Sequence, residues 1–117
     1  MESVPHYFLG TLPWLPVMDG AEMAVLQGGP GAPGEYVIRF RTDREIFVPP
    51  QWHRHDENVT VMSGPFSLSV DNQRGELAPG SSIVIPAKVH HSAWYAAGTV
   101  VQVSGIGPFE SVYVDRV

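Results

Sequence analysis

The residues best suited to chemistry are histidines, and four of the five fall in two short clusters, at positions 53 and 55 and at positions 90 and 91. The first cluster lies in the segment 51–57, Gln-Trp-His-Arg-His-Asp-Glu. On an extended chain, residues two apart share a face. One face is therefore predicted to carry four polar side chains: Gln51, His53, His55 and Glu57. Val59 and Val61 continue this face, which indicates that it is the inner one.

Polar side chains on the apolar side of a strand are costly unless they are hydrogen-bonded or bound to a metal. Imidazole nitrogen and carboxylate oxygen suit Fe, Ni, Mn or Zn. A hydrogen-bonded His–Glu pair at a strand end is the alternative for the first cluster. In the second cluster, His90 and His91 face opposite sides, so at most one joins the first cluster, and a surface histidine pair is the alternative. Two clusters in one small domain favour a metal site.

The charge balance excludes several classes of partner. The 117 residues carry 7 Lys and Arg against 12 Asp and Glu, a net charge of −5, and Lys88 is the only lysine. No basic stripe is available for a phosphate backbone, so we expect no nucleic-acid partner. No apolar run approaches the ~18 residues of a membrane span. Cysteine is absent, which excludes disulfides and thiolate sites. With no secretory-signal pattern at the N-terminus, these features predict a cytoplasmic protein.

Glycine and proline determine the expected fold class. The 12 glycines and 11 prolines make up about a fifth of the chain and are poor in helix interiors. The longest segment free of both runs only from Glu35 to Val48. Many short segments between turns predict an all-β fold, an antiparallel β-barrel of two sheets. The expected strands are residues 21–27, 36–41, 45–49, 66–70, 82–85, 91–95, 99–104 and 109–114, with a turn at 71–75.

The chain is expected to be one domain, with residues 1–20 as an N-terminal arm packing on a barrel of residues 21–117. The glycines at 29, 31 and 34 satisfy the dinucleotide pattern GxGxxG. That pattern requires a helix to follow, whereas residues 36–41 alternate with a period of two and predict a strand. The expected core is supplied by apolar residues of the strands: Ile38, Phe40, Val59, Val61, Leu68, Ile83, Ile85 and Val101.

Two segments carry a resemblance to a known family. The first reads Gln51-x-His53, three residues, Glu57, six residues, Gly64; the second reads Gly80, five residues, Pro86-x-Lys88, two residues, His91. These spacings resemble the two motifs of the cupins, small β-barrel proteins, with Gln51 in place of the first histidine and Lys88 in place of a glycine. The surrounding sequence is similar to acetylacetone-cleaving dioxygenases and to the cupin domain of ChrR-type anti-sigma factors.

The resemblance implies a cupin jelly roll with a divalent metal ion on His53, Glu57 and His91. Gln51 matches the fourth ligand position, and its neutral amide is a weaker donor than imidazole. We place Gln51 in the metal shell ahead of His55. Two histidines and one carboxylate form the facial triad of non-haem Fe(II) oxygenases, so Fe(II) is expected first, with Mn, Ni or Zn as alternatives.

The expected function is a dioxygenase-like reaction on a small enolisable or dicarbonyl substrate. A redox-neutral isomerase, cyclase or lyase is the alternative, with His55 or Glu57 as the proton-transfer group. A non-enzymatic small-ligand sensor is a further alternative, for which the departure at Gln51 is the argument. The resemblance also implies a homodimer.

Overall fold

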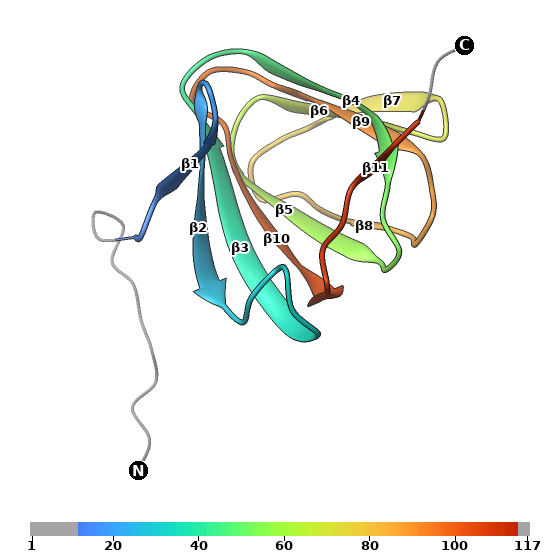
Figure 1. The fold of residues 1–117 in the computed structure, drawn as a ribbon. Helices are drawn as coiled ribbons and strands as arrows, with labels where there is room; N and C mark the ends of the chain where they lie inside the picture. Colours follow the sequence, from blue (N-terminus) through green and yellow to red (C-terminus); the bar gives the residue numbers. More distant parts are fainter. Residues whose placement is uncertain (1–11, 115–117) are drawn as a thin grey trace.

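The computed structural model describes residues 12–114. Eleven strands form two antiparallel sheets that face each other, and no helix occurs among the described residues (Figure 1). The predicted all-β, double-sheet barrel is therefore confirmed. Residues 12–114 contain no helix that is long and apolar enough to cross a membrane.

The first sheet has six strands in the order β1-β2-β3-β10-β5-β8. Their bounds are Leu15–Met18 (β1), Ala21–Gln27 (β2), Gly34–Thr42 (β3), Val100–Gly107 (β10), Glu57–Ser63 (β5) and Ser82–Ile85 (β8). The second sheet has five strands in the order β11-β4-β9-β6-β7. Their bounds are Val112–Tyr113 (β11), Ile46–Trp52 (β4), His91–Tyr95 (β9), Phe66–Val70 (β6) and Gln73–Leu77 (β7).

The strands expected to end at residues 49 and 104 extend to Trp52 (β4) and Gly107 (β10), and two other elements differ more. The turn predicted at residues 71–75 occupies only Asp71 and Asn72, whose φ angles are 50° and 69°. Positive φ at both central residues matches the right-handed twist of a tight hairpin, so the chain pairs again from Gln73 as β7. The strand predicted over 109–114 shrinks to β11, because Phe109 and Glu110 cross from one sheet to the other instead of pairing.

The core lies between the two sheets, where alternate side chains of each strand point inward. Of the residues expected there, six are buried, and Phe40 and Ile83 are partly buried against them. The buried cluster comprises Tyr36, Ile38, Val59, Val61, Phe66, Leu68, Ile85, Ala93, Val101 and Val103. These side chains form the rigid support on which a site between the sheets depends.

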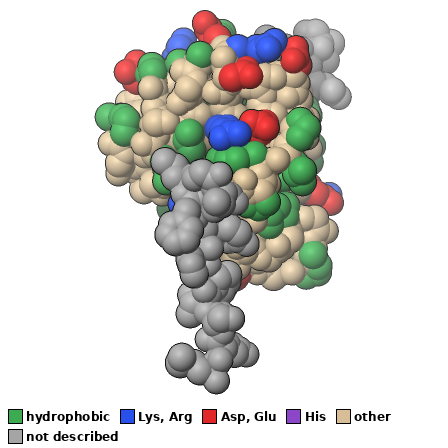
Figure 2. Space-filling model, turned by 90° about the vertical axis from the view of Figure 1, so that its left-hand side faces the viewer, with side chains coloured by type: hydrophobic (Ala, Val, Ile, Leu, Met, Phe, Trp, Pro, Cys, Tyr) green, Lys and Arg blue, Asp and Glu red, His purple; other side chains and the backbone are tan. Residues whose placement is uncertain are grey.

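The N-terminal part of the described chain adds β1 to one edge of the six-stranded sheet. Leu12 is buried, and the guanidinium of Arg41 lies 4.0 Å from the Trp14 ring centroid. β1 pairs only with β2 and exposes Leu15, Val17 and Met18 at the sheet edge. Figure 2 shows this side, with hydrophobic side chains beside acidic and basic ones.

The predicted division at residue 20 falls in the β1–β2 hairpin, and residues 1–11 of the predicted arm lie outside the described residues. The homodimer stays a prediction.

Shortening one core side chain should destabilise the barrel measurably. Ile38 is buried on β3, so Ile38→Val should lower the free energy of unfolding by about 0.5–1.5 kcal/mol, because a small cavity remains. The measurement is urea denaturation, with Val84→Ala as the control. Val84 is 54% exposed, and its replacement should stay within about 0.5 kcal/mol. Equal losses in both variants would contradict the assignment of Ile38 to the core.

Candidate metal centre

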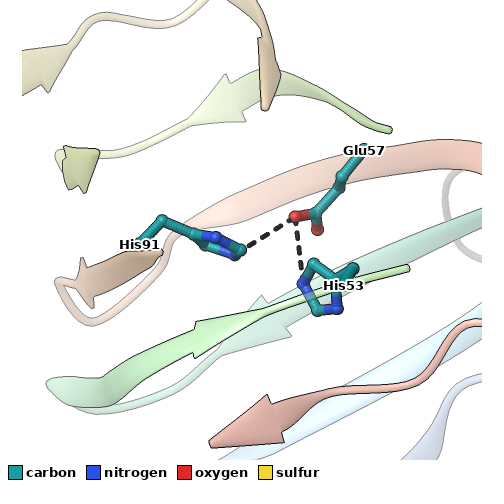
Figure 3. Close-up of side chains that lie close together, drawn as sticks. All are labelled: His53, Glu57 and His91. Carbon is teal, nitrogen blue, oxygen red and sulfur yellow. Dashed lines mark ion pairs between the residues drawn. The ribbon is translucent and has the colours of Figure 1, made fainter. Parts of the chain in front are cut away.

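Three polar side chains from both sheets meet inside the barrel. His53 directly follows β4, and His91 is the first residue of β9, so both come from the five-stranded sheet. Glu57 is the first residue of β5 in the six-stranded sheet. All three are buried, and their side chains point toward one another (Figure 3). A site built in this way spans the space between the sheets.

The three side chains are spaced as ligands of one ion. Nε2 of His53 lies 3.3 Å from Oε1 of Glu57, and Nε2 of His91 lies 3.4 Å from the same oxygen. One atom from each residue can be chosen so that all lie within 4.8 Å of one another. Charge-assisted N–H···O bonds are typically shorter, ~2.7–2.9 Å. Ligand atoms ~2.1 Å from a shared ion, at angles of ~90–110°, are roughly 3.0–3.4 Å apart, which matches the two measured separations.

Backbone carbonyls orient both imidazole rings. Nδ1 of His53 lies 2.8 Å from the carbonyl oxygen of Glu110, and Nδ1 of His91 lies 3.1 Å from that of Val89. A carbonyl only accepts, so Nδ1 carries the proton in each ring. A neutral ring then presents the lone pair of Nε2 toward Glu57. Within the described residues, Nε2 of His53 and Oε1 of Glu57 are buried without a hydrogen-bond partner. Facing acceptors of this kind fit a cation held between them.

The charges of the cluster keep the carboxylate ready to bind. Burial acts to raise the pKa of Glu57, but protonated His53 and His91 would donate hydrogen bonds to it and add their charges, which outweighs burial and lowers the pKa to about 2. Burial acts to lower the pKa of His53, but its protonated ring would donate to Glu57 and be stabilised by the charge of that carboxylate, so the pKa of His53 is raised. At neutral pH Glu57 is therefore ionised, and a positive charge is favoured at the position that a metal ion would take.

Gln51 lies beside this cluster. It is opposite His91 in the β4–β9 pairing, which puts both side chains on the inner face. The residue is 9% exposed, and its Oε1 has no hydrogen-bond partner among the described residues. An unpartnered buried oxygen next to a ligand set fits a fourth donor or a contact to a metal-bound molecule.

His55 does not share the inner face with Gln51, His53 and Glu57, contrary to expectation. β4 ends at Trp52 and the chain bends at Arg54 and His55 before β5 begins. Strand alternation therefore does not extend across residues 53–56, and His55 is exposed. The geometry gives no support to the proton-transfer role predicted for it. His90 is also exposed, whereas His91 is buried.

The backbone at Lys88 explains the glycine of the motif, not the lysine that replaces it here. Lys88 has φ 68°, in the left-handed region that favours glycine. Its backbone N–H donates to the carbonyl of His53 at 2.7 Å. This bond ties the segment before His91 to the segment that carries His53, so it holds the two histidine clusters together.

Sequence reasoning missed the groups that cover the site. The Phe109 ring lies 4.6 Å from the His53 ring, between centroids, and Glu110 supplies the carbonyl that orients His53. The Glu110 carboxylate also pairs with Nε of Arg54 at 2.9 Å. A backbone carbonyl is common to all residue types, so no side-chain pattern could have identified this contact.

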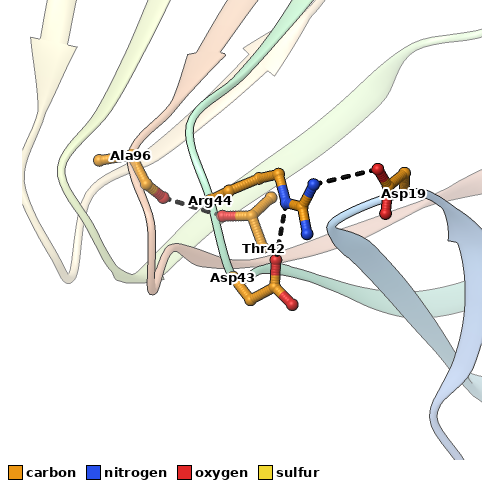
Figure 4. A network of polar contacts seen from close by, with 5 residues as sticks. All are labelled: Asp19, Thr42, Asp43, Arg44 and Ala96. Atoms are coloured by element: carbon orange, nitrogen blue, oxygen red, sulfur yellow. Dashed lines mark hydrogen bonds and ion pairs between the residues drawn. The ribbon is translucent and has the colours of Figure 1, made fainter.

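A second polar network lies at the other end of β3 and joins three turns (Figure 4). Arg44 pairs with Asp19 at 3.0 Å and with Asp43 at 3.3 Å, and the hydroxyl of Thr42 donates to the carbonyl of Ala96 at 2.8 Å. Six residues along a strand separate this end from Tyr36, roughly 20 Å. The network holds turns together and is separate from the histidine cluster.

Comparisons with known proteins agree with this architecture. A family model described as a cupin domain matches residues 43–103. KdgF from Halomonas sp. is similar in structure, with a TM-score of 0.74 and 19% identity over 90% of this chain and 96% of that one. The polyketide cyclase RemF from Streptomyces resistomycificus has a TM-score of 0.78 and 18% identity over 98% of this chain and 88% of that one.

A salicylate 1,2-dioxygenase from Pseudaminobacter salicylatoxidans is similar over 81% of this chain and 30% of its own, with 14% identity and a TM-score of 0.68. A search of curated proteins finds no match. At these identities the structural neighbours show the fold alone. The family model covers more than half of the chain and includes both histidine clusters, so this protein belongs to the cupin family.

Proposed function

We propose that this chain is a metal-dependent cupin enzyme that acts on a small enolisable or 1,3-dicarbonyl substrate, with a dioxygenase-like reaction. The observation that carries the proposal is the buried group of His53, Glu57 and His91, whose ligand atoms converge. Two histidines and a carboxylate are the donor set of non-haem Fe(II) oxygenases, and they leave coordination positions open. Fe(II) is the proposed metal, with Mn, Ni or Zn as alternatives.

The chain's own residues would hold and shield the reacting groups. His53, Glu57 and His91 would bind the cation, which when present supplies a Lewis acid or a site for O₂. Glu110 and Val89 would keep both imidazoles in the Nδ1–H form through their carbonyls. The apolar walls around the cluster would exclude water and strengthen charge interactions with an anionic substrate oxygen.

A redox-neutral reaction, such as isomerisation, cyclisation or elimination, is the second candidate. His53, Glu57 and His91 would hold the same cation for this reaction, and that cation would supply a Lewis acid for a carbonyl without using O₂. The structural similarity to a polyketide cyclase over nearly the whole chain supports a redox-neutral reaction as the second candidate. A ligand-binding protein without turnover is the third candidate, and the amide at Gln51 in place of a stronger donor is the observation that favours it.

The test begins with elemental analysis of the natively purified protein, followed by loading with Fe(II), Mn(II), Ni(II) or Zn(II) under anaerobic conditions. Each form is mixed with acetylacetone, and enol absorbance and O₂ consumption are recorded together. One O₂ consumed per substrate supports the dioxygenase, whereas substrate loss without O₂ uptake supports the redox-neutral reaction. Glu57→Gln, which removes the carboxylate of the proposed metal ligands, is the control variant for metal uptake and for reaction with acetylacetone. A protein that takes up none of these metals contradicts the proposal.

A further inference from the structure

A row of inward-facing residues crosses the six-stranded sheet at the level of the metal site. Gly105 on β10 is paired with Tyr36 on β3 and with Glu57 on β5, and Glu57 is paired with Ile85 on β8. Directly paired residues project from the same face of a sheet. Tyr36 and Glu57 therefore lie on one face with only a glycine between them.

The absence of a side chain at Gly105 makes room for the phenol of Tyr36. A Cβ at position 105 would lie 3.1 Å from the Tyr36 hydroxyl oxygen and 3.4 Å from its Cε2. The ring therefore leans across β10, and its hydroxyl lies above the glycine rather than above its own strand. Neighbouring strands are ~4.8 Å apart. A hydroxyl above β10 therefore lies about one strand spacing nearer to Glu57 than a hydroxyl above β3 would.

The surroundings hold this hydroxyl in place and keep it protonated. Tyr36 is 2% exposed, and its ring packs edge-on against Phe109, with centroids 5.6 Å apart. Phe109 in turn contacts His53. Burial, and then the negative charge of Glu57, raise the pKa of Tyr36 above its usual value. No hydrogen bond joins the Tyr36 hydroxyl to another residue of 12–114, and a phenol O–H can donate one to a bound molecule.

We propose that the Tyr36 hydroxyl donates a hydrogen bond to an anionic oxygen of the ligand that binds beside Glu57, and that Gly105 is required to place it there. The ligand class is an oxyanion such as an enolate or a carboxylate. This inference rests on the proposed metal-dependent function for its ligand class, but its test measures binding, and turnover is not needed. Tyr36 is thus a specificity residue of the site rather than a metal ligand.

The test compares wild type with Tyr36→Phe, both loaded with Ni(II). Affinity for acetylacetonate, which offers anionic oxygens, should fall about tenfold to a hundredfold, the value of a hydrogen bond to a charged group. Affinity for imidazole should change less than about twofold, because metal-bound imidazole has no acceptor left for the hydroxyl. Nickel affinity, measured by chelator competition, should also be unchanged. Ser82→Ala is the control, since it also removes one hydroxyl, but from an exposed residue of β8.

Three results would overturn the inference. Unchanged acetylacetonate affinity would show that the hydroxyl does not contact the ligand. A parallel loss for acetylacetonate and imidazole, or a loss of nickel affinity, would show that the hydroxyl supports Glu57 instead. A nickel-loaded wild type that binds neither probe would show that no ligand reaches this position. Phenylalanine keeps the ring packing, whereas alanine at Gly105 would also lie 2.8 Å from the carbonyl of Asp56, so Tyr36→Phe is the cleaner variant.

Discussion

His53→Ala and His91→Ala are each expected to lower the affinity for the bound metal by more than about 100-fold. Removing only the hydrogen-bond partner of a metal ligand costs less than this. Each histidine supplies one of the three converging ligand atoms, and two remaining donors cannot hold a divalent ion in the same way. Metal affinity is measured by competition with a chelator, and metal content by elemental analysis.

The barrel should stay folded in both variants, because its stability comes from the apolar cluster between the sheets and not from the histidines. Circular dichroism and thermal unfolding check this point. His90→Ala is the matched control, since His90 adjoins His91 but is exposed, and it should leave metal affinity unchanged. A variant that unfolds while its remaining folded fraction binds metal normally would show that the histidine is structural.

Gln51→His is expected to tighten metal binding by about tenfold or more, which corresponds to ~1.4 kcal/mol or more. Gln51 faces the interior opposite His91, and its amide oxygen lacks a partner. An imidazole at this position would give a four-ligand shell with a stronger donor than a neutral amide. We expect no gain in turnover, because the new ligand occupies a position that water or substrate uses. Chelator competition with wild type and Gln51→His measures the change.

His55→Ala serves as the control for this substitution. His55 is exposed beyond the bend after β4, so its removal should leave metal affinity unchanged in wild type and in Gln51→His. Equal affinities for wild type and Gln51→His, together with a loss of affinity in His55→Ala, would show that His55 already completes the shell in solution. Gln51 would then have no place in it.

Local sequence patterns were sufficient for the fold class and for most strands. Period-two alternation of apolar residues specifies which side of a strand is buried, and glycine and proline mark where strands stop. The inner residues of β3, β5, β6 and β10 follow from this rule alone. It was insufficient at the β6–β7 hairpin, where Asp71 and Asn72 adopt positive φ and make a turn shorter than the composition of the segment indicates.

The residue types and spacing by themselves limited a metal site to the two histidine clusters and Glu57, because ligand chemistry belongs to the side chain, and the resemblance to the cupin motifs selected Gln51, His53, Glu57 and His91. Only the tertiary structure showed that His55 is exposed and does not share the inner face with the other three residues of its segment. β4 and β5 lie in different sheets, so residues 53–56 must cross between them and cannot keep the alternation of one strand. The carbonyls of Glu110 and Val89 and the place of Tyr36 above Gly105 were likewise decided by tertiary structure. Each arises where segments distant in sequence meet, and neither a backbone group nor a missing side chain leaves a local pattern.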